Sequence, residues 1–217
     1  MKVRQGFWLA MLLLVIMVVG FAGVGSSGSK DTTVKLPRTG QTTCYDNSGN
    51  VISCTNTGQD GDLQKGIAWP HPRFSANADT TITDNLTGLV WAPNGNVMAI
   101  RDPHWEKQGP AADGAVTWQH ALDYIAKLNT ENYLGHNDWR LPNFKELGSL
   151  VNNAQLNTAA WLNKQGFTNV QAGDFYWSST SFADDAAKAW VVDMTYGNVN
   201  YFSKPNNHYV WPVRGGQ

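Results

Sequence analysis

The amino-acid sequence predicts an exported domain of mixed α+β structure, and three observations lead to this class. Apolar residues recur at helical spacing in residues 118–129, and a helix-capping pattern follows Pro142. Short apolar runs separated by glycine, proline and asparagine indicate strands joined by tight turns. Ten tryptophans and only 15% charged residues indicate a core built around large aromatic rings. These features favour two helices beside several hairpins.

The clearest predicted helix covers Trp118–Asn129. Thr117 precedes it and can accept a hydrogen bond from the unpaired amides of the first turn. The apolar stripe of this helix consists of Trp118, Ala121, Leu122, Ile125 and Leu128. His120 lies off the stripe, so we expect it to be a solvated helix residue.

The second predicted helix begins inside Gly135–Val151, the stretch around which the chain is organised. Pro142 favours an extended conformation for the residue before it. Asn143 and Glu146 then supply the Asn-Phe-Lys-Glu pattern of a capping box. The apolar face of this helix would contain Phe144, Leu147, Leu150 and Val151.

Arg140 is predicted to be a structural clamp. In an extended segment Trp139 and Leu141 point to one side, so Arg140 points to the other. A guanidinium between two apolar anchors needs an acceptor, and a carboxylate or carbonyl group would serve. A ligand contact is the alternative for this side chain.

The remaining pattern indicates strands, loops and turns. The predicted strand segments are Ile67–Phe74 at a sheet edge or leading into the domain, Thr80–Trp91 as a hairpin, Phe175–Thr180, Ala189–Thr195 paired with Asn198–Phe202, and Val210–Arg214. We expect Pro93–Gly114 to cross the surface as a loop, and Asn152–Asn169 is amide-rich with no predicted helix.

The hairpin that ends at Phe202 has two specific expectations. Gly197 and Asn198 would supply the positive φ angles of its tight turn. Trp190, Val192 and Met194 alternate with a mixed set of residues, so one face should be apolar and the other mixed.

The N-terminal 26 residues have the layout of an export signal. Lys2 and Arg4 precede the apolar run Phe7–Val19, and small residues follow it. The same segment could stay uncleaved as a membrane anchor, because the apolar stretch approaches the length that spans a bilayer. Residues 27–43 are interpreted as a linker, and the protein is expected to be extracellular, surface-bound or periplasmic.

Residues 44–66 are predicted to form a disulfide-closed hairpin followed by an acidic turn. Cys44 and Cys54 flank a turn sequence and are the only cysteines, so in an exported chain we expect them to pair. Gly58–Asp62 is interpreted as a solvated turn because it lacks the regularly spaced carboxylates of a calcium loop. Calcium at Asp60 and Asp62 is the alternative.

Charge excludes one class of partner. The chain has 16 basic and 17 acidic residues, and removal of Lys2 and Arg4 with the export segment leaves 14 basic residues. This balance provides no electrostatic footprint for nucleic acid. Contact with a membrane is expected only through an uncleaved N-terminal segment.

We predict two roles for the aromatic residues: core anchors for several tryptophans, and a ligand surface for residues near the C-terminus. Trp91, Trp139, Trp177 and Trp190 are expected to be structural core anchors. A calcium-free ligand surface is predicted for the late aromatics and amides Tyr201, Asn206, Asn207, Tyr209 and Trp211.

The sequence contains no recognisable catalytic or metal site, and we predict no cofactor. No nucleophile elbow surrounds Ser178, Ser179 or Ser181. The five histidines have no pair at ligand spacing. Ligands that converge in space from distant positions remain the alternative. The chain is therefore predicted not to be an enzyme.

Four ordered motifs carry a resemblance to a known family. They are Thr87–Trp91, Asp138–Asn143 with Glu146-Leu147, Tyr176–Thr180 and Val213–Gly216. Over about residues 80–216 the chain resembles the Lcl C-terminal domain, an exported domain named after a collagen-like bacterial adhesin. The Trp-Arg-Leu-Pro block is also similar to the formylglycine-generating enzyme, whose chemistry needs cysteines that residues 67–217 lack.

The resemblance implies a C-type-lectin-like fold for residues 67–217, with two helices packed on a small twisted antiparallel sheet with long loops. It also implies adhesion, with sulfated glycans as ligands of the named adhesin. This chain has no Gly-X-Y repeat and no basic net charge, which argues against an anionic polysaccharide. We predict a non-enzymatic recognition or adhesion module for an extracellular glycan or protein. The alternative is a structural subunit or tip of an envelope assembly or filament, and homo-oligomers are compatible with both.

Overall fold

The computed structural model of the protein describes residues 36–105 and 113–215. The predicted export segment, residues 1–26, and most of the predicted linker lie outside these ranges. Within them, no helix has both the length and the apolar composition to cross a membrane.

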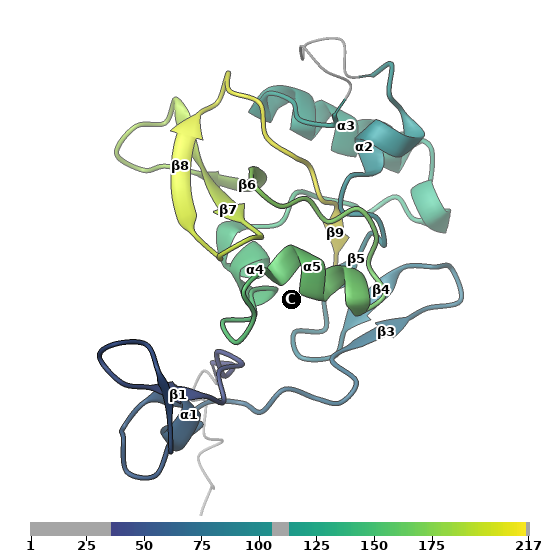
Figure 1. The fold of residues 1–217 in the computed structure, drawn as a ribbon. Coiled ribbons are helices and arrows are strands. Elements are labelled where there is room, and N and C mark those ends of the chain that lie inside the picture. Colours follow the sequence, from purple (N-terminus) through teal and green to yellow (C-terminus); the bar gives the residue numbers. More distant parts are fainter. Residues whose placement is uncertain (1–35, 106–112, 216–217) are drawn as a thin grey trace, which may run out of the picture. The chain divides into compact units, whose positions relative to one another are not determined.

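The described chain is a mixed α+β structure, which confirms the predicted class (Figure 1). Its helices are α1 Asp60–Leu63, α2 Val97–Arg101, α3 Trp118–Thr130, α4 Phe144–Ser149 and α5 Thr158–Lys164, with a 3₁₀ turn at Tyr133–Gly135. Its strands are β1 Cys44–Tyr45, β2 Val51–Ile52, β3 Phe74–Ala76, β4 Ile82–Asp84, β5 Val90–Trp91, β6 Phe175–Ser181, β7 Lys188–Asp193, β8 Val199–Ser203 and β9 Val213–Arg214. They form antiparallel sheets ordered β1-β2, β3-β4-β5-β9 and β6-β7-β8.

Both predicted helices are present with the predicted caps. The Thr117 side chain accepts a hydrogen bond from the His120 amide at the start of α3. Asn143 and Glu146 form the reciprocal capping box of α4. The buried face of α3 also contains Tyr124, which the predicted apolar stripe did not include.

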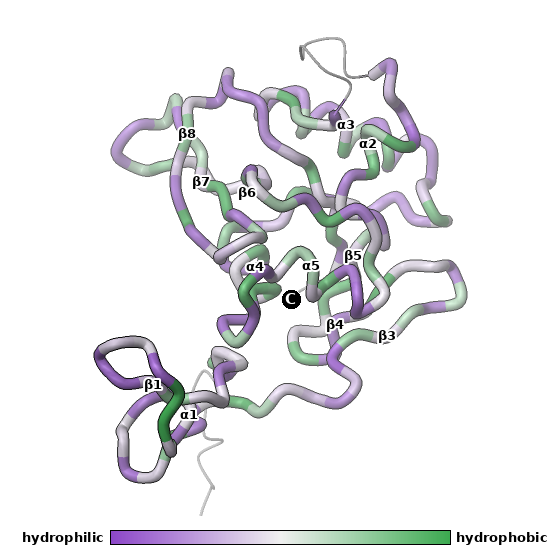
Figure 2. Tube along the Cα trace, in the orientation of Figure 1, coloured by the Kyte–Doolittle hydropathy of each residue, from purple (hydrophilic) through white to green (hydrophobic). Residues whose placement is uncertain are grey.

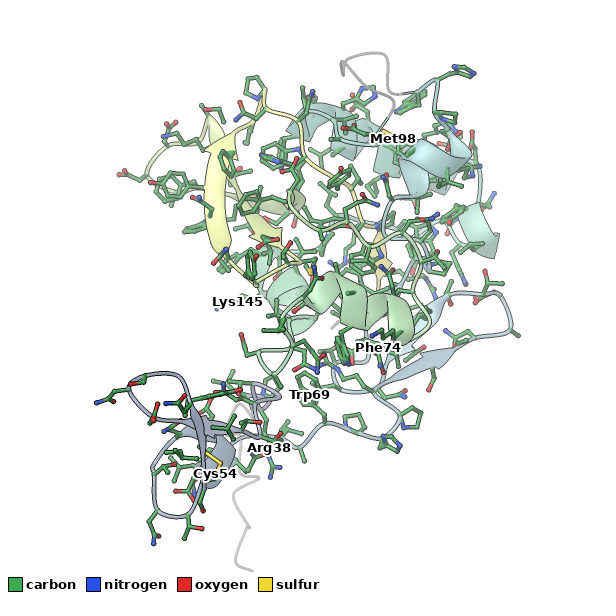
Figure 3. The ribbon with its side chains drawn as sticks, in the orientation of Figure 1. Arg38, Cys54, Trp69, Phe74, Met98 and Lys145 are labelled. Atoms are coloured by element: carbon green, nitrogen blue, oxygen red, sulfur yellow. A yellow bond between two sulfur atoms is a disulfide. The ribbon has the colours of Figure 1, made fainter. Side chains whose placement is uncertain are left out.

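Two segments contain helices that the pattern did not predict. Pro93–Gly114, expected to be a surface loop, contains α2, which Figure 2 shows as a hydrophobic segment and whose Val97 and Met98 are buried (Figure 3). Asn152–Asn169 contains α5, capped by the Asn157 side chain. Helices this short are marginal on their own and depend on tertiary packing, so local periodicity identifies them poorly.

Strand β7 differs from the prediction in its burial. It lies between β6 and β8, and α4 contacts both β6 and β7. Val191, Val192 and Asp193 are therefore all buried, and neither face is open along this part of the strand. The turn that follows also needs a correction, because Gly197 has a positive φ and Asn198 does not.

The predicted disulfide between Cys44 and Cys54 is confirmed (Figure 3). It closes the β1–β2 hairpin, in which Cys44 lies opposite Ile52. Such bonds persist in oxidising compartments, so the disulfide supports an extracytoplasmic location.

The predicted acidic turn after the disulfide hairpin is partly helical. Helix α1 begins at Asp60, and Gln59 occupies its N-cap position without a capping hydrogen bond from its side chain. The Asp60 carboxylate accepts a hydrogen bond from the Thr39 hydroxyl, and that of Asp62 accepts one from the Gly58 amide. In residues 36–105 and 113–215, no group of three or more histidine, cysteine or acidic side chains could hold a metal ion.

Two helical glycines should respond to alanine in opposite ways. A Cβ at Gly61 would lie 2.7 Å from Cys44 Sγ and 2.9 Å from Cys54 Sγ, whereas a Cβ at Gly148 meets nothing within 4 Å. We expect Gly148→Ala to stabilise α4 by about 0.5–1 kcal/mol. Gly61→Ala should destabilise the disulfide hairpin by about 1–3 kcal/mol through overpacking. Thermal unfolding and hydrogen exchange of residues 43–64 test both, and equal effects of the two variants would contradict the assignment.

Candidate functional site

Arg140 connects the segment before α4 to helix α4 and to the C-terminal strand β9. Its backbone N–H donates to the Val213 carbonyl at 2.9 Å, and its guanidinium contacts both Glu146 carboxylate oxygens at 2.7 and 2.8 Å. Nη2 also donates to the Gly215 carbonyl at 2.7 Å. Glu146 meanwhile accepts from the Asn143 amide as part of the capping box. The side chain thus has the carboxylate and carbonyl partners expected of a clamp, and Trp139 beside it is buried.

A second clamp, at Arg73, was not identified from the sequence. Arg73 donates through Nε and Nη2 to the two carboxylate oxygens of Asp84, each at 3.0 Å, and both side chains are buried. Nη2 also donates to the Ser149 carbonyl at the end of α4, at 2.7 Å. The guanidinium carbon lies 4.2 Å from the centre of the Trp69 ring system. Arg73 lies within the predicted extended segment Ile67–Phe74, and spacing alone could not pair it with Asp84.

A surface hollow of about 400 Å³ lies beside α2 and α3. We call it the Trp105 hollow. Its lining residues are Arg101, Asp102, Pro103, His104, Trp105 and Lys127. None of these six belonged to the ligand surface predicted from the sequence.

The wall of the Trp105 hollow is an ion-paired network. Asp102 accepts hydrogen bonds from Lys127 at 2.9 Å, from the Tyr124 hydroxyl at 2.9 Å and from Arg101 at 2.6 Å. Arg101 and Lys127 also contact Glu131. Two cations and two carboxylates therefore balance one another at this surface.

The network keeps Asp102 ionised. Burial acts to raise the pKa of Asp102, but the hydrogen bonds from Lys127 and Tyr124 and the charge of Arg101 outweigh it, so this pKa lies below its ordinary value. Burial and the bond to Asp102 raise the pKa of Tyr124, which stays a neutral donor. The hollow therefore offers fixed charges at neutral pH.

Trp105 contributes the aromatic part of the hollow and is 36% exposed. Its carbonyl oxygen lies 2.7 Å from His120 Nε2, and the two rings are 5.7 Å apart. Lys127 Nζ lies 5.7 Å from the indole centre. His120 was expected to be solvated, but it is half-buried and supports the Trp105 backbone.

The predicted ligand residues differ in their exposure. Tyr201 is exposed on β8, Asn206 is exposed in the following turn, and Asn207 is half-buried. Tyr209 is half-buried and its ring lies 5.7 Å from that of Tyr176. A ligand surface at these four residues stays a prediction.

Trp211 belongs to the core, which corrects its assignment to the surface. Its indole N–H donates to the Ala92 carbonyl at 2.9 Å, and its ring packs against Trp91 and Phe167. Strand β9 pairs with β5, and this pairing carries the preceding residues into the interior. Trp91 and Trp177 are buried as expected of core anchors, whereas Trp190 is half-buried.

Tyr201 belongs to an aromatic patch on the β6-β7-β8 sheet. The patch consists of Phe144, Phe182, Trp190 and Tyr201. Phe182 and Tyr201 stack with ring centres 4.1 Å apart and planes at 7°, and Phe144 stacks on Trp190 at 5.4 Å. Stacking covers a face of each of these rings, which leaves less aromatic face open to a sugar ring.

His208 is a buried titratable group whose protonation should weaken the fold. Its Nδ1 lies 2.9 Å from Asp174 Oδ1, and its ring packs against Trp177 and Phe202. Nε2 is buried and has no hydrogen-bond partner among the described residues. Burial lowers the pKa of His208 below its ordinary 6.5, although Asp174 opposes the shift. The unfolded chain therefore takes up a proton that the folded chain resists.

We expect stability to fall as the pH drops below about 6.5, down to the folded pKa of His208, because the unfolded state binds more protons there. In His208→Phe this part of the pH dependence should disappear. Urea unfolding between about pH 7 and pH 5 measures it, with exposed His104→Gln as the control for loss of an imidazole. An unchanged slope in His208→Phe would contradict the assignment.

Comparison with known proteins identifies the family. The model of the Lcl C-terminal domain matches residues 80–214, which is more than half of the chain. The match includes α3, the Arg140–Glu146 pair, the β6-β7-β8 sheet and the residues of the Trp105 hollow. No curated protein gives a significant match. The chain belongs to the Lcl C-terminal domain family.

Proposed function

We propose that this protein is an exported, non-enzymatic recognition or adhesion module of C-type-lectin-like architecture that binds a surface glycan. The observation that carries this proposal is the exposed Trp105 indole on the wall of a polar hollow. The hollow has the size usual for small-ligand sites, which range over about 300–1,000 Å³. The two helices α3 and α4 beside small antiparallel sheets support the architecture.

The chemistry of the Trp105 hollow favours a hydroxyl-rich ligand of low charge. An indole face packs against the C–H groups of a sugar ring, while ionised side chains at the rim hydrogen-bond its hydroxyls. Arg101 and Lys127 are already paired with Asp102 and Glu131, so little positive charge is left to attract a polyanion. A neutral saccharide segment fits this balance better than a sulfated one.

The same network argues for binding without catalysis. The described residues that line the hollow include no serine, threonine or cysteine that could act as a nucleophile. Asp102 is held by three donors and its lowered pKa makes it a poor proton acceptor near neutral pH. The carboxylate therefore serves as a fixed hydrogen-bond acceptor.

Glycan arrays and calorimetry with the full chain test this function. We expect Trp105→Ala to weaken saccharide binding about 5- to 150-fold, because stacking of a nucleobase on an aromatic ring contributes on the order of 1–3 kcal/mol. Trp105→Phe should be intermediate. Leu156→Ala, which removes an apolar side chain that is 95% exposed outside the hollow, is the control. Absence of any bound saccharide, or equal binding by Trp105→Ala, would overturn the proposal.

A further inference from the structure

Strand β8 is the open edge of the β6-β7-β8 sheet (Figure 1). It pairs with β7 over Val199–Ser203. The hydrogen bonds from Asp193 N to Asn198 O and from Lys204 N to Ala187 O set the register. Because backbone direction alternates in an antiparallel pair, Asn200 and Phe202 face β7, while the N–H and C=O groups of Val199, Tyr201 and Ser203 point outward.

The opposite edge of this sheet is covered. The Trp177 amide donates to the Tyr209 carbonyl at 2.9 Å, and the Tyr209 amide donates to the Phe175 carbonyl at 3.0 Å. Farther along β6, the Ser179 amide donates to the Pro142 carbonyl. The outward backbone groups of β6 therefore have hydrogen-bond partners in the segments around Tyr209 and Pro142.

The edges of the four-stranded sheet are also protected. Strand β9 exchanges backbone hydrogen bonds with Arg140 through Val213. Strand β3 is only three residues long. Within residues 36–105 and 113–215, β8 is therefore the longest edge strand that no other segment covers.

The outer side of β8 has only local contacts among the described residues. The Tyr201 amide donates to its neighbour Asn200 Oδ1 at 2.8 Å, and the Ser203 carbonyl accepts from the Asn206 amide at 2.9 Å. The carbonyl can accept a second bond, and the Asn200 side chain can rotate away. The outward backbone N–H and C=O groups of β8 are therefore accessible to an added strand.

The composition of β8 favours pairing with another strand. Proteins protect edge strands with charged residues, proline or bulges, and the sequence Val-Asn-Tyr-Phe-Ser has no charge and no proline. Val199 is 47% exposed and Tyr201 is 39% exposed. Both point to the face that carries the aromatic patch, so a neighbouring strand would bury apolar surface as well as backbone groups.

We propose that β8 pairs with β8 of a second copy of this chain, antiparallel and about a two-fold axis, to form a continuous six-stranded sheet. With Tyr201 opposite its equivalent, Val199 lies opposite Ser203 of the second copy and every outward backbone group meets a complementary one. Strand β8 itself carries no charge, so its own side chains bring no like charges together. The edge is therefore complementary to itself, as a two-fold interface requires.

This pairing uses no residue of the Trp105 hollow. It stands whether or not that hollow binds a saccharide. If both hold, one dimer presents two hollows, and the second binding event gains from effective concentration.

Sedimentation velocity of the full chain over a concentration series tests the pairing. The wild-type chain is expected to dimerise. Tyr201→Lys places two cations opposite each other and should abolish the dimer, and Val199→Pro should do so by removing an outward N–H that β7 does not use. Asn200→Ala frees the Tyr201 amide and should leave dimerisation equal or stronger.

Tyr196→Lys is the matched control, because Tyr196 is exposed in the turn before β8 and faces no strand. Thermal unfolding of each variant establishes that the monomer is folded. A wild-type chain that stays monomeric throughout, or a dimer that persists in Tyr201→Lys, would overturn the proposal, and capture of a different protein by a monomeric wild type would count against it equally.

Discussion

Asp84→Asn is expected to destabilise the protein by about 3–5 kcal/mol, because it leaves a buried guanidinium without its counter-charge. Asp84 is fully buried and accepts from Arg73, from the Leu86 amide at 3.0 Å and from the Thr87 hydroxyl at 3.0 Å. Arg73 also ties this turn to the end of α4 through Ser149. The loss should therefore be visible as a lower midpoint in urea unfolding.

The matched control is Asp138→Asn, which removes the carboxylate of an exposed pair with Arg214. Exposed pairs contribute about 0–1 kcal/mol, so this variant should unfold near the wild-type midpoint. The double variant Arg73→Met/Asp84→Leu should recover part of the loss, since it removes the buried charge altogether. Similar midpoints for Asp84→Asn and Asp138→Asn would show that the buried pair contributes no more to stability than the exposed pair.

Glu146→Ala is expected to cost about 2–4 kcal/mol, because it removes a helix cap and a charged hydrogen-bond partner at once. Glu146 accepts from the Asn143 amide and from both terminal nitrogens of Arg140. Without it, Arg140 keeps only carbonyl acceptors, including that of Gly215. The C-terminal strand β9 should then exchange its amides faster, which hydrogen exchange can measure.

A double-mutant cycle separates the two roles of Glu146. Arg140→Leu removes the clamp and keeps the cap, and a coupling energy of about 0.5–3 kcal/mol between positions 140 and 146 is expected for residues in direct contact. Lys145→Ala, at an exposed neighbouring position of α4, is the control. A coupling energy near zero would mean that Arg140 and Glu146 act independently.

Several features of this fold were predictable because they depend on residues close in the chain. The cap of α3 joins Thr117 to an amide three residues on, and the capping box of α4 spans Asn143 to Glu146. The Cys44–Cys54 bond closes a short hairpin and involves the only two cysteines. In each case the partners lie within a few turns of the chain, so residue type and spacing were sufficient.

The candidate site could not be predicted in the same way. The Trp105 hollow needs Lys127 of α3 to reach Asp102 after α2, a contact across 25 residues between a helix that was predicted and one that was not. The predicted surface around Tyr201 included Trp211 because aromatic residues near polar ones can lie inside or outside a domain. Burial of that ring was decided by pairing of β9 with β5.

The sequence by itself determined the α+β class, the two capped helices, the disulfide hairpin and the family to which residues 80–214 belong. Only the tertiary structure decided which carboxylate holds Arg73, that Trp211 is buried, and where an indole faces solvent beside fixed charges. The physical reason is separation along the chain: the Trp211 indole bonds a carbonyl 119 residues away, and Arg73 reaches one 76 residues away. Contacts of that range depend on how the sheets and helices pack, which spacing within a single element does not encode.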